Sequence, residues 1–287
     1  MPQNFLFYLI FLSQIILISY YYPRQIISRM NYVFETYPPQ KYPKLYAKPI
    51  KHYAKRKNIY GILNMVILVV GMLTLGAIAF WVESSKGSIS EIIPFLYFLL
   101  QIIPVLLLEI SGFAYFRLMR KADIRKTRIA ELHPRRLFDF ISPLYVFMAV
   151  VLFFICILFF LYLDNFQFSV GSDSFVITMT LAASHIVFIA TIYWHLYGKK
   201  LDPYQAGNDR LRQAEISIKS VVFMSIGSSL FLMFIKYINR LDLNYLEPTF
   251  ISVFLQFSIL IGLGSMLRNL RLENLNFDVY KENVPVS

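Results

Sequence analysis

The chain has 287 residues, 57% of them hydrophobic, and a formal net charge of +11. A soluble domain is typically about 45–50% apolar. The excess here gathers in runs of about 20 residues, the length that an α-helix needs to cross a bilayer core about 30 Å thick. This composition excludes an ordinary soluble domain. Because Lys and Arg flank the apolar runs, orientation in a membrane explains the positive charge better than binding to nucleic acid does, and we expect no nucleic-acid partner.

Seven apolar runs predict an all-α integral membrane protein, a polytopic helical bundle with seven transmembrane helices that forms one transmembrane domain over 1–287. The expected spans are, in chain order, about 5–22, 60–82, 92–116, 140–163, 175–197, 220–237 and 250–267.

The first span has the position of a signal peptide, but its flanks oppose cleavage. No Lys or Arg precedes it, no small-residue cleavage site follows it, and it runs directly into Tyr22, Pro23 and Arg24. Positive charge after the span and none before it predicts a retained helix with its N-terminus outside.

The positive charge is strongly one-sided along the chain. Four segments hold 25 of the 28 Lys and Arg residues, namely 23–59, 117–139, 198–219 and 268–287. By the positive-inside rule these segments are predicted to be cytoplasmic, and the C-terminus with them. The expected location is the plasma membrane, with a bacterial inner membrane as the default for so loop-poor a multi-pass chain.

The first basic segment contains two features that could bind partners. Residues 37–46 are rich in Tyr, Pro and Lys, and X-Pro steps favour an extended path, so this stretch is either a ligand for a protein partner or a rigid linker on the membrane surface. Next to the second span stand Lys51, Lys55, Arg56 and Lys57. They are candidates for contacting anionic lipid headgroups, at about 1 kcal/mol per basic residue, although they could serve only to set the topology.

Two further helical extensions are expected in the basic segments. The third span is predicted to continue as a helix over 117–132, where His133 and Pro134 stop it, because proline disfavours helix in the residues before it. A helix over about 210–219 is expected to run into the sixth span.

The motifs of common soluble enzymes are absent from the sequence, which has no GxxxxGK[ST], HExxH, GxSxG, GxGxxG or CxxC. Its single cysteine, Cys156, excludes an intrachain disulfide and a metal site built on several thiolates. We expect Cys156 to be a small buried hydrophobe, and we expect neither a metal nor a cofactor.

Polar residues within spans are the useful signal for a site, because an ionised group at the bilayer centre costs about 2.5–3.5 kcal/mol and usually faces the bundle interior. Glu109 is the only acidic residue well inside a predicted span. At 100° per residue, Gln101, Val105, Glu109 and Gly112 share one helical stripe near Pro104, and such a stripe could line a cavity. The alternative is a neutral Glu109 that hydrogen-bonds to a neighbouring helix.

Two histidines are further candidates. His185 lies near the middle of the fifth span and His195 near its end. A pKa near 6.5 makes protonation of an imidazole accessible, and the alternative is a neutral ring that hydrogen-bonds within the bundle. Asn64 and Gln256 are interpreted as packing residues that join helices.

Three hypotheses for the function remain open. The first is a small transporter or channel-like protein with a polar intramembrane site at Glu109 and His185. The second is a membrane-embedded enzyme acting on an amphipathic or lipid substrate at the cytoplasmic interface, where Glu109 and His195 would contribute. The third is a non-catalytic accessory or receptor-like protein that binds a partner through the first cytoplasmic segment. The first predicts a water-accessible path to the midplane, the second a convergence of titratable groups, and the third a filled bundle.

Overall fold

The computed structural model describes residues 4–85, 88–123, 135–166 and 169–282. Within these ranges the regular structure is entirely helical, and seven helices are long and apolar enough to cross a membrane. The predicted all-α class is therefore confirmed, and the number of helices able to cross a membrane by length and composition equals the predicted number of spans.

The helices follow one another along the chain with short connections. The first is continuous and comprises α1, a π-helical turn η1 and α2, and the last comprises α8, a second π-helical turn η5 and α9. Their bounds are α1 Phe5–Ile16, η1 Leu17–Tyr21, α2 Tyr22–Thr36, α3 Ile50–Ser85, α4 Ile92–Ala122, α5 Pro143–Leu163, α6 Asp173–Tyr197, α7 Gly207–Arg240, α8 Glu247–Ile259, η5 Leu260–Gly264 and α9 Ser265–Asn269. Short 3-10 turns lie between or after them: η2 Pro43–Leu45, η3 Leu137–Asp139, η4 Asn244–Leu246, η6 Leu272–Asn274 and η7 Phe277–Tyr280.

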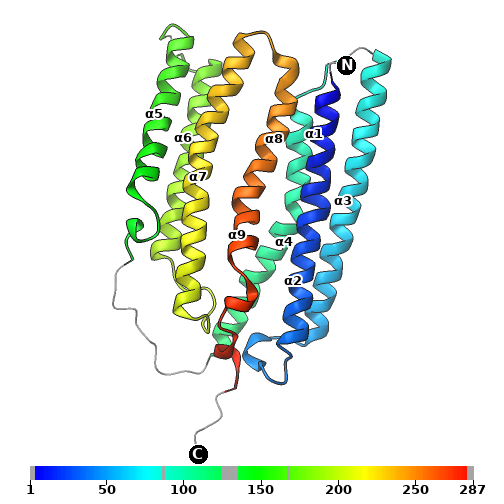
Figure 1. The fold of residues 1–287 in the computed structure, drawn as a ribbon, viewed down its shortest axis with the longest axis vertical. Helices are drawn as coiled ribbons and strands as arrows, with labels where there is room; N and C mark the ends of the chain where they lie inside the picture. Colours follow the sequence, from blue (N-terminus) through cyan, green and yellow to red (C-terminus); the bar gives the residue numbers. More distant parts are fainter. Residues whose placement is uncertain (1–3, 86–87, 124–134, 167–168, 283–287) are drawn as a thin grey trace, which may run out of the picture.

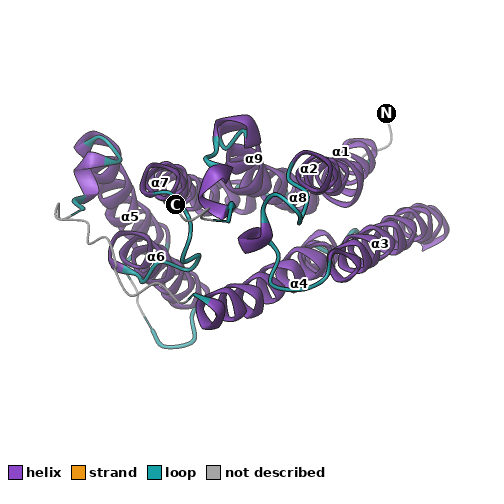
Figure 2. Ribbon diagram, turned by 90° about the horizontal axis from the view of Figure 1, so that it is seen from below, coloured by secondary structure: helices purple, strands orange, loops and turns teal. Residues whose placement is uncertain are grey.

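The long helices stand side by side in two groups. Helices α5, α6 and α7 form one group, while α1 to α4 form the other, and α8 lies between them (Figure 1). Viewed along the helices, α7, α8 and α1 make one layer and α6, α4 and α3 make the second (Figure 2). Helix α7 packs against α5, α6 and α8, and α8 packs against α1 and α4. Thus α7 and α8 join the two groups.

The outward surface of the bundle is apolar. Phe80 is 76% exposed, Leu73 67% and Ile186 66%, all in the middle or upper parts of long helices. Soluble proteins rarely expose contiguous apolar patches of more than a few hundred Å². An outer surface of this kind is suited to lipid, and it supports a multi-pass membrane protein.

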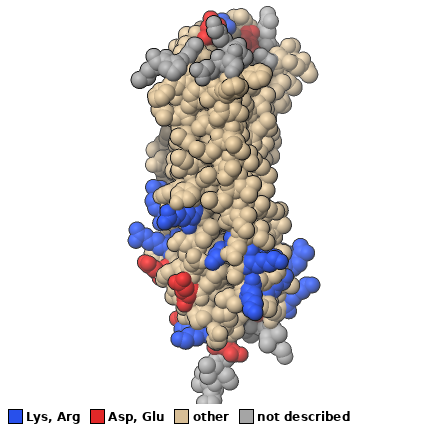
Figure 3. All heavy atoms as spheres, turned by 90° about the vertical axis from the view of Figure 1, so that its right-hand side faces the viewer, with Lys and Arg blue, Asp and Glu red and all other residues tan. Residues whose placement is uncertain are grey.

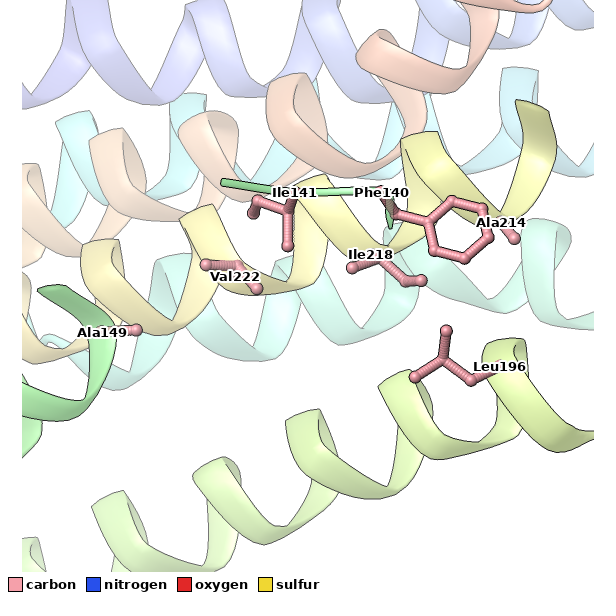
Figure 4. Packing of buried hydrophobic residues seen from close by; sticks show 7 residues of the cluster. All are labelled: Phe140, Ile141, Ala149, Leu196, Ala214, Ile218 and Val222. Atoms are coloured by element: carbon pink, nitrogen blue, oxygen red, sulfur yellow. The ribbon is translucent and has the colours of Figure 1, made fainter. Parts of the chain in front are cut away.

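Each group has its own apolar core. In the first, Leu196 from α6, Ile218 and Val222 from α7, and Phe140 and Ile141 from the segment before α5 pack together (Figure 4). Since α7 contributes to this core along much of its length, it acts as the centre of its group. In the second group, the largest buried cluster joins α1, α3 and α4 and contains Phe7, Phe11, Ile15, Ile67, Ile78 and Tyr97.

The first helix continues beyond its predicted end at Tyr22 and reaches Thr36. Proline within an α-helix clashes with the carbonyl four residues earlier, which for Pro23 is the carbonyl of Ser19. The π-helical turn Leu17–Tyr21 widens the helix at this position, because its hydrogen bonds skip one residue more than those of an α-helix. Pro23 therefore stands in the first turn of α2 without ending the helix.

Other helices also extend beyond the apolar runs. Helix α3 begins at Ile50 instead of Tyr60, and α7 begins at Gly207, which confirms that a helix over 210–219 runs into the sixth span. Lys, Arg, Glu and Gln are good helix formers, so these helices continue into polar sequence that a hydropathy pattern does not include. Helix α4 continues to Ala122 and ends there, because Asp123 is extended. The predicted helix over 117–132 is therefore confirmed to Ala122 and wrong at Asp123, and 124–134, with His133 and Pro134, lie outside the described residues.

Charged side chains gather toward the ends of the bundle. Figure 3 shows a broad uncharged belt, with most of the visible Lys and Arg beyond its lower edge. We call this the basic end. It holds the connections α2–α3 and α6–α7 and the residues after α9 (Figure 1). The N-terminus lies at the opposite end.

The predicted orientation places the basic end in the cytoplasm. A Cys156→Ala chain with a single cysteine at Ser88 or Ser169, which are exposed at the opposite end, should react with an impermeant thiol reagent added to intact cells. A single cysteine at Lys41, exposed at the basic end, should react only after the membrane is opened. Labelling of the Lys41→Cys protein in intact cells, with none at Ser88 or Ser169, would invert the predicted topology.

Candidate functional site

The largest fully buried polar side chains among the described residues are two glutamines from different helices. Gln14 of α1 is 0% exposed and Gln101 of α4 is 2% exposed. Gln14 Nε2 donates to Gln101 Oε1 at 3.1 Å, and Gln101 Nε2 donates to Ser19 Oγ at 2.9 Å. From α8, Ser252 Oγ donates to Gln14 Oε1 at 2.6 Å. Three helices are thus joined through two amide side chains.

Further hydrogen bonds extend this cluster to α3. The hydroxyls of Ser19 and Tyr97 lie 3.3 Å apart, and Tyr97 donates to the backbone carbonyl of Ile67 at 3.0 Å. Next to Gln14 in α1, Ser13 donates to Gln256 Oε1 at 2.9 Å. We call the set Gln14, Ser19, Tyr97, Gln101 and Ser252 the glutamine network.

The glutamine network is uncharged, and its groups are committed to one another. A polar group in hydrocarbon costs several kcal/mol unless it is hydrogen-bonded, so mutual pairing is what allows these residues to be buried. Both glutamine amides use their donors and their acceptors within the bundle. The network therefore holds α1, α3, α4 and α8 at fixed positions relative to one another.

Sequence reasoning identified Gln101 but missed Gln14, Ser19 and Ser252. A single glutamine within the first apolar run was a visible signal. Its partner was not, because Gln14 and Gln101 are 87 residues apart and Gln14 and Ser252 are 238 apart. Periodicity places residues on one helical face and says nothing about which helix that face meets.

The two π-helical turns are each joined to a neighbouring helix by a polar side chain. Gln101 Nε2 reaches the carbonyl of Gln14 at 3.3 Å, just before η1, and Ser220 Oγ of α7 reaches the carbonyl of Ile261 in η5 at 2.9 Å. A π-helical turn disturbs the regular backbone ladder, and these donors supply bonds to carbonyls beside it. The Tyr22 side chain, which follows η1, packs against Gly264 at the end of η5.

The approach of Tyr22 to Gly264 predicts a selective effect of adding one methyl group. A Cβ at Gly264 would overlap the Tyr22 hydroxyl, whereas a Cβ at Gly262 would meet nothing within 4 Å. Because Tyr22 is buried, Gly264→Ala should lower the free energy of unfolding by about 1–3 kcal/mol, and Gly262→Ala should be neutral or slightly stabilising. Unfolding of both variants in mixed micelles measures the difference. Equal effects of the two substitutions would contradict this packing.

Glu109 lies on the exposed face of α4 and forms no hydrogen bond or ion pair with any other described residue. At 1.5 Å per residue it stands about 25 Å along the helix from Ile92. For a hydrocarbon core about 30 Å thick that begins at Ile92, this distance corresponds to a position in the half of the core nearer the basic end. Its carboxylate is separate from the enclosed amide of Gln101.

The two histidines lie in α6. His185 Nδ1 is 2.9 Å from the carbonyl of Leu181, and its ring packs on Phe153 and Phe188 at centroid distances of 4.7 and 5.7 Å. His185 Nε2 is buried and has no partner among the described residues. His195 Nδ1 is 2.8 Å from the carbonyl of Thr191. Both rings thus bond to their own helix.

The four intramembrane candidates do not meet in one place. Within the described part of the chain, no hydrogen bond, ion pair or ring contact joins any two of Gln101, Glu109, His185 and His195. The described part of the chain also contains no group of three or more His, Cys, Asp or Glu side chains arranged to hold a metal ion. Cys156 is buried against α7, with Sγ 3.5 Å from the carbonyl of Ser229.

At the basic end, three connections pack into one folded layer. The Tyr37 ring stacks on Phe277 at 3.9 Å, and Tyr46 donates to the carbonyl of Tyr37 at 2.7 Å. Tyr115 of α4 donates to the carbonyl of Leu45. We call residues 37–46, 198–205 and 270–281 the basic-end cap.

A buried hydrogen bond joins the C-terminal part of this cap to the α6–α7 connection. Tyr280 donates to Asp202 Oδ2 at 2.5 Å, and Asp202 Oδ1 accepts from the backbone N–H of Tyr204 at 2.8 Å. Burial and the adjacent Asp202 carboxylate raise the pKa of Tyr280 above its usual range. The phenol therefore stays neutral and remains a donor to Asp202 at physiological pH.

The four basic residues at the start of α3 point in three directions, because Lys51 and Lys55 are about 40° apart while Lys57 lies about 120–160° from them, toward α2. Lys51 and Lys55 are exposed, while Lys57 donates to Asn31 Oδ1 at 2.7 Å and lies 5.9 Å from the centre of the Phe34 ring. At 100° per residue, Arg56 points about 100° or more away from the other three.

No family model, curated protein or solved structure matches the chain.

Proposed function

We propose that the protein is a non-catalytic accessory or receptor-like membrane protein that binds a protein partner through the basic-end cap. The glutamine network carries this proposal. The two largest buried polar side chains of one helix group, Gln14 and Gln101, are bonded to each other and to Ser19 and Ser252.

The state of these groups supports a packing role over solute transport. A transporter would need intramembrane polar groups that can exchange their partners for a solute or a proton. Here both glutamine amides are committed to other helices, and the His185 ring lies between two phenylalanine rings. A titratable group held in this way contributes to helix packing.

The cap supports a docking role. Its aromatic core, with Tyr37 stacked on Phe277 and Tyr280 bonded to Asp202, fixes segments from three parts of the chain in one surface. Lys41 and Arg271 are exposed on it. Aromatic residues and arginine are enriched in protein interfaces, and the positive charge favours a partner with acidic groups.

Site-specific photocrosslinking in intact cells tests this proposal. A photoreactive amino acid at Gln40, exposed in the cap, should give one defined crosslinked species, and the same amino acid at Ser88 at the opposite end should not. Phe277→Ala removes the stack on Tyr37 and should reduce the crosslinked fraction. Absence of a defined species at Gln40, or an equal species at Ser88, would reject docking through the cap.

A further inference from the structure

The outer side of α3 combines an apolar groove with a row of basic residues at one end. The groove has a volume of about 670 Å³ and lies between α3 and Ile27 of α2, with Lys57 and Asn58 at its basic end. Beyond them it is lined by apolar residues up to Val70. It differs from the cap both in position and in chemistry.

Helical spacing extends the groove directly to the exposed lysines. At 100° per residue, six exposed residues of α3 fall within about 80° of one another. They are Lys51, Lys55, Asn58, Ile62, Met65 and Val69. One continuous stripe is therefore basic for its first turns and apolar afterwards. Figure 3, which faces the α3 side of the bundle, shows Lys and Arg beyond the lower edge of an uncharged belt.

We infer that this stripe binds an anionic phospholipid of the leaflet at the basic end, with one acyl chain along the groove and the phosphate among Lys51, Lys55 and Lys57. The length fits, because the distance from Lys57 to Val70 is about 20 Å at 1.5 Å per residue, and half of a hydrocarbon core is about 15 Å. The ammonium of Lys57 is held at the end of the groove by Asn31. Because the amide oxygen of Asn31 carries no formal charge, the positive charge of Lys57 remains available to pair with a phosphate.

The side chains of the groove favour an acyl chain over a partner helix. Helices that pack closely in membranes need small residues at the contact. Here Ile62 is 63% exposed, Met65 53% and Val69 53%, and these bulky, uneven side chains suit a flexible hydrocarbon chain. Gly61 provides the depth at the basic end, where a Cβ would already lie 3.4 Å from Ile27 Cδ1.

Native mass spectrometry of the purified full-length chain in detergent tests the site. The probes are phosphatidylglycerol and phosphatidylcholine with identical acyl chains. The wild-type chain should bind phosphatidylglycerol at least about 10-fold more tightly, because a lysine near an anionic group is worth about 5-fold in affinity. The combined Lys51→Gln, Lys55→Gln and Lys57→Gln chain should lose this preference and bind both lipids alike.

Two controls make the result specific. Arg56 lies on the same turn of α3 but points about 160° away from Asn58 of the groove, so Arg56→Gln should keep the preference for phosphatidylglycerol. Ile62→Trp fills the groove at an exposed position and should weaken binding of both lipids, with an unfolding transition like that of the wild-type chain. Excess inorganic phosphate should not displace the lipid. An unchanged preference in the triple-lysine variant, an equal loss in Arg56→Gln, or full displacement by phosphate would overturn the proposal.

Discussion

Gln101→Leu is expected to lower the free energy of unfolding by about 2–3 kcal/mol, which is large for a polar-to-apolar change inside a membrane protein. The substitution removes the acceptor of Gln14 Nε2 and the donor to Ser19 Oγ, both of which are enclosed. Interhelical hydrogen bonds in membranes average about 0.6 kcal/mol each. The expected loss exceeds the sum because the groups left behind cannot reach water.

The control for this prediction is Thr74→Val, also within a span. The Thr74 hydroxyl donates only to the carbonyl of Val70 in its own helix, at 2.8 Å, so its removal should change stability by less than about 0.5 kcal/mol. Unfolding in mixed micelles measures both variants, and Gln14→Leu completes a double-mutant cycle with Gln101→Leu. Additive effects of the two glutamine substitutions would show that the amides do not interact.

The second large effect is expected at Gly71. A Cβ there would overlap the hydroxyl and ring of Tyr97, which is buried and donates to Ile67. Either the ring or α3 has to move, and overpacking of this kind costs about 1–3 kcal/mol. Because the movement would also break the bond from Tyr97 to Ile67, we expect Gly71→Ala to lie at the upper end of that range, about 3 kcal/mol.

Gly76 in the same helix is a matched control. A Cβ at Gly76 would meet nothing within 4 Å, and alanine favours helix over glycine by up to about 1 kcal/mol. Gly76→Ala should therefore be neutral or slightly stabilising in the same unfolding measurement. If Gly71→Ala behaved like Gly76→Ala, the close approach of α3 and α4 at Tyr97 would be wrong.

The seven spans could be predicted from the sequence because apolar length and flanking charge are local properties. The helix ends were harder to predict. The first span was predicted to end at about Tyr22, but the helix continues past a π-helical turn and through Pro23 to Thr36. The polar start of α7 likewise continues an apolar helix without a break. Hydropathy locates the part of a helix that lies in hydrocarbon, and helix propensity carries the helix further.

The candidate site could be predicted only in part, because it depends on how helices meet. Gln101 was selected for its helical stripe with Glu109, yet it faces Gln14 while Glu109 lies on the exposed side of α4. The basic cluster at 51–57 was identified as a group, but Lys57 lines the groove beside α2 whereas Arg56 points about 160° away from Asn58 of that groove. The charge and polarity of each residue follow from its type, whereas its partner depends on how the helices pack and could not be predicted.

The glutamine network has a consequence for biosynthesis. Gln14 emerges from the ribosome in the first helix, whereas Ser252, its partner in the last, is synthesised 238 residues later. Helix α1 must therefore remain in the bilayer through most of translation with a glutamine whose final set of partners does not yet exist. Gln101 of α4 is the earlier of its two side-chain partners to arrive. Helix α1 should therefore depend most on the insertion machinery in a nascent chain that is stalled before α4. In a chain arrested after α4, the insertion machinery should release α1.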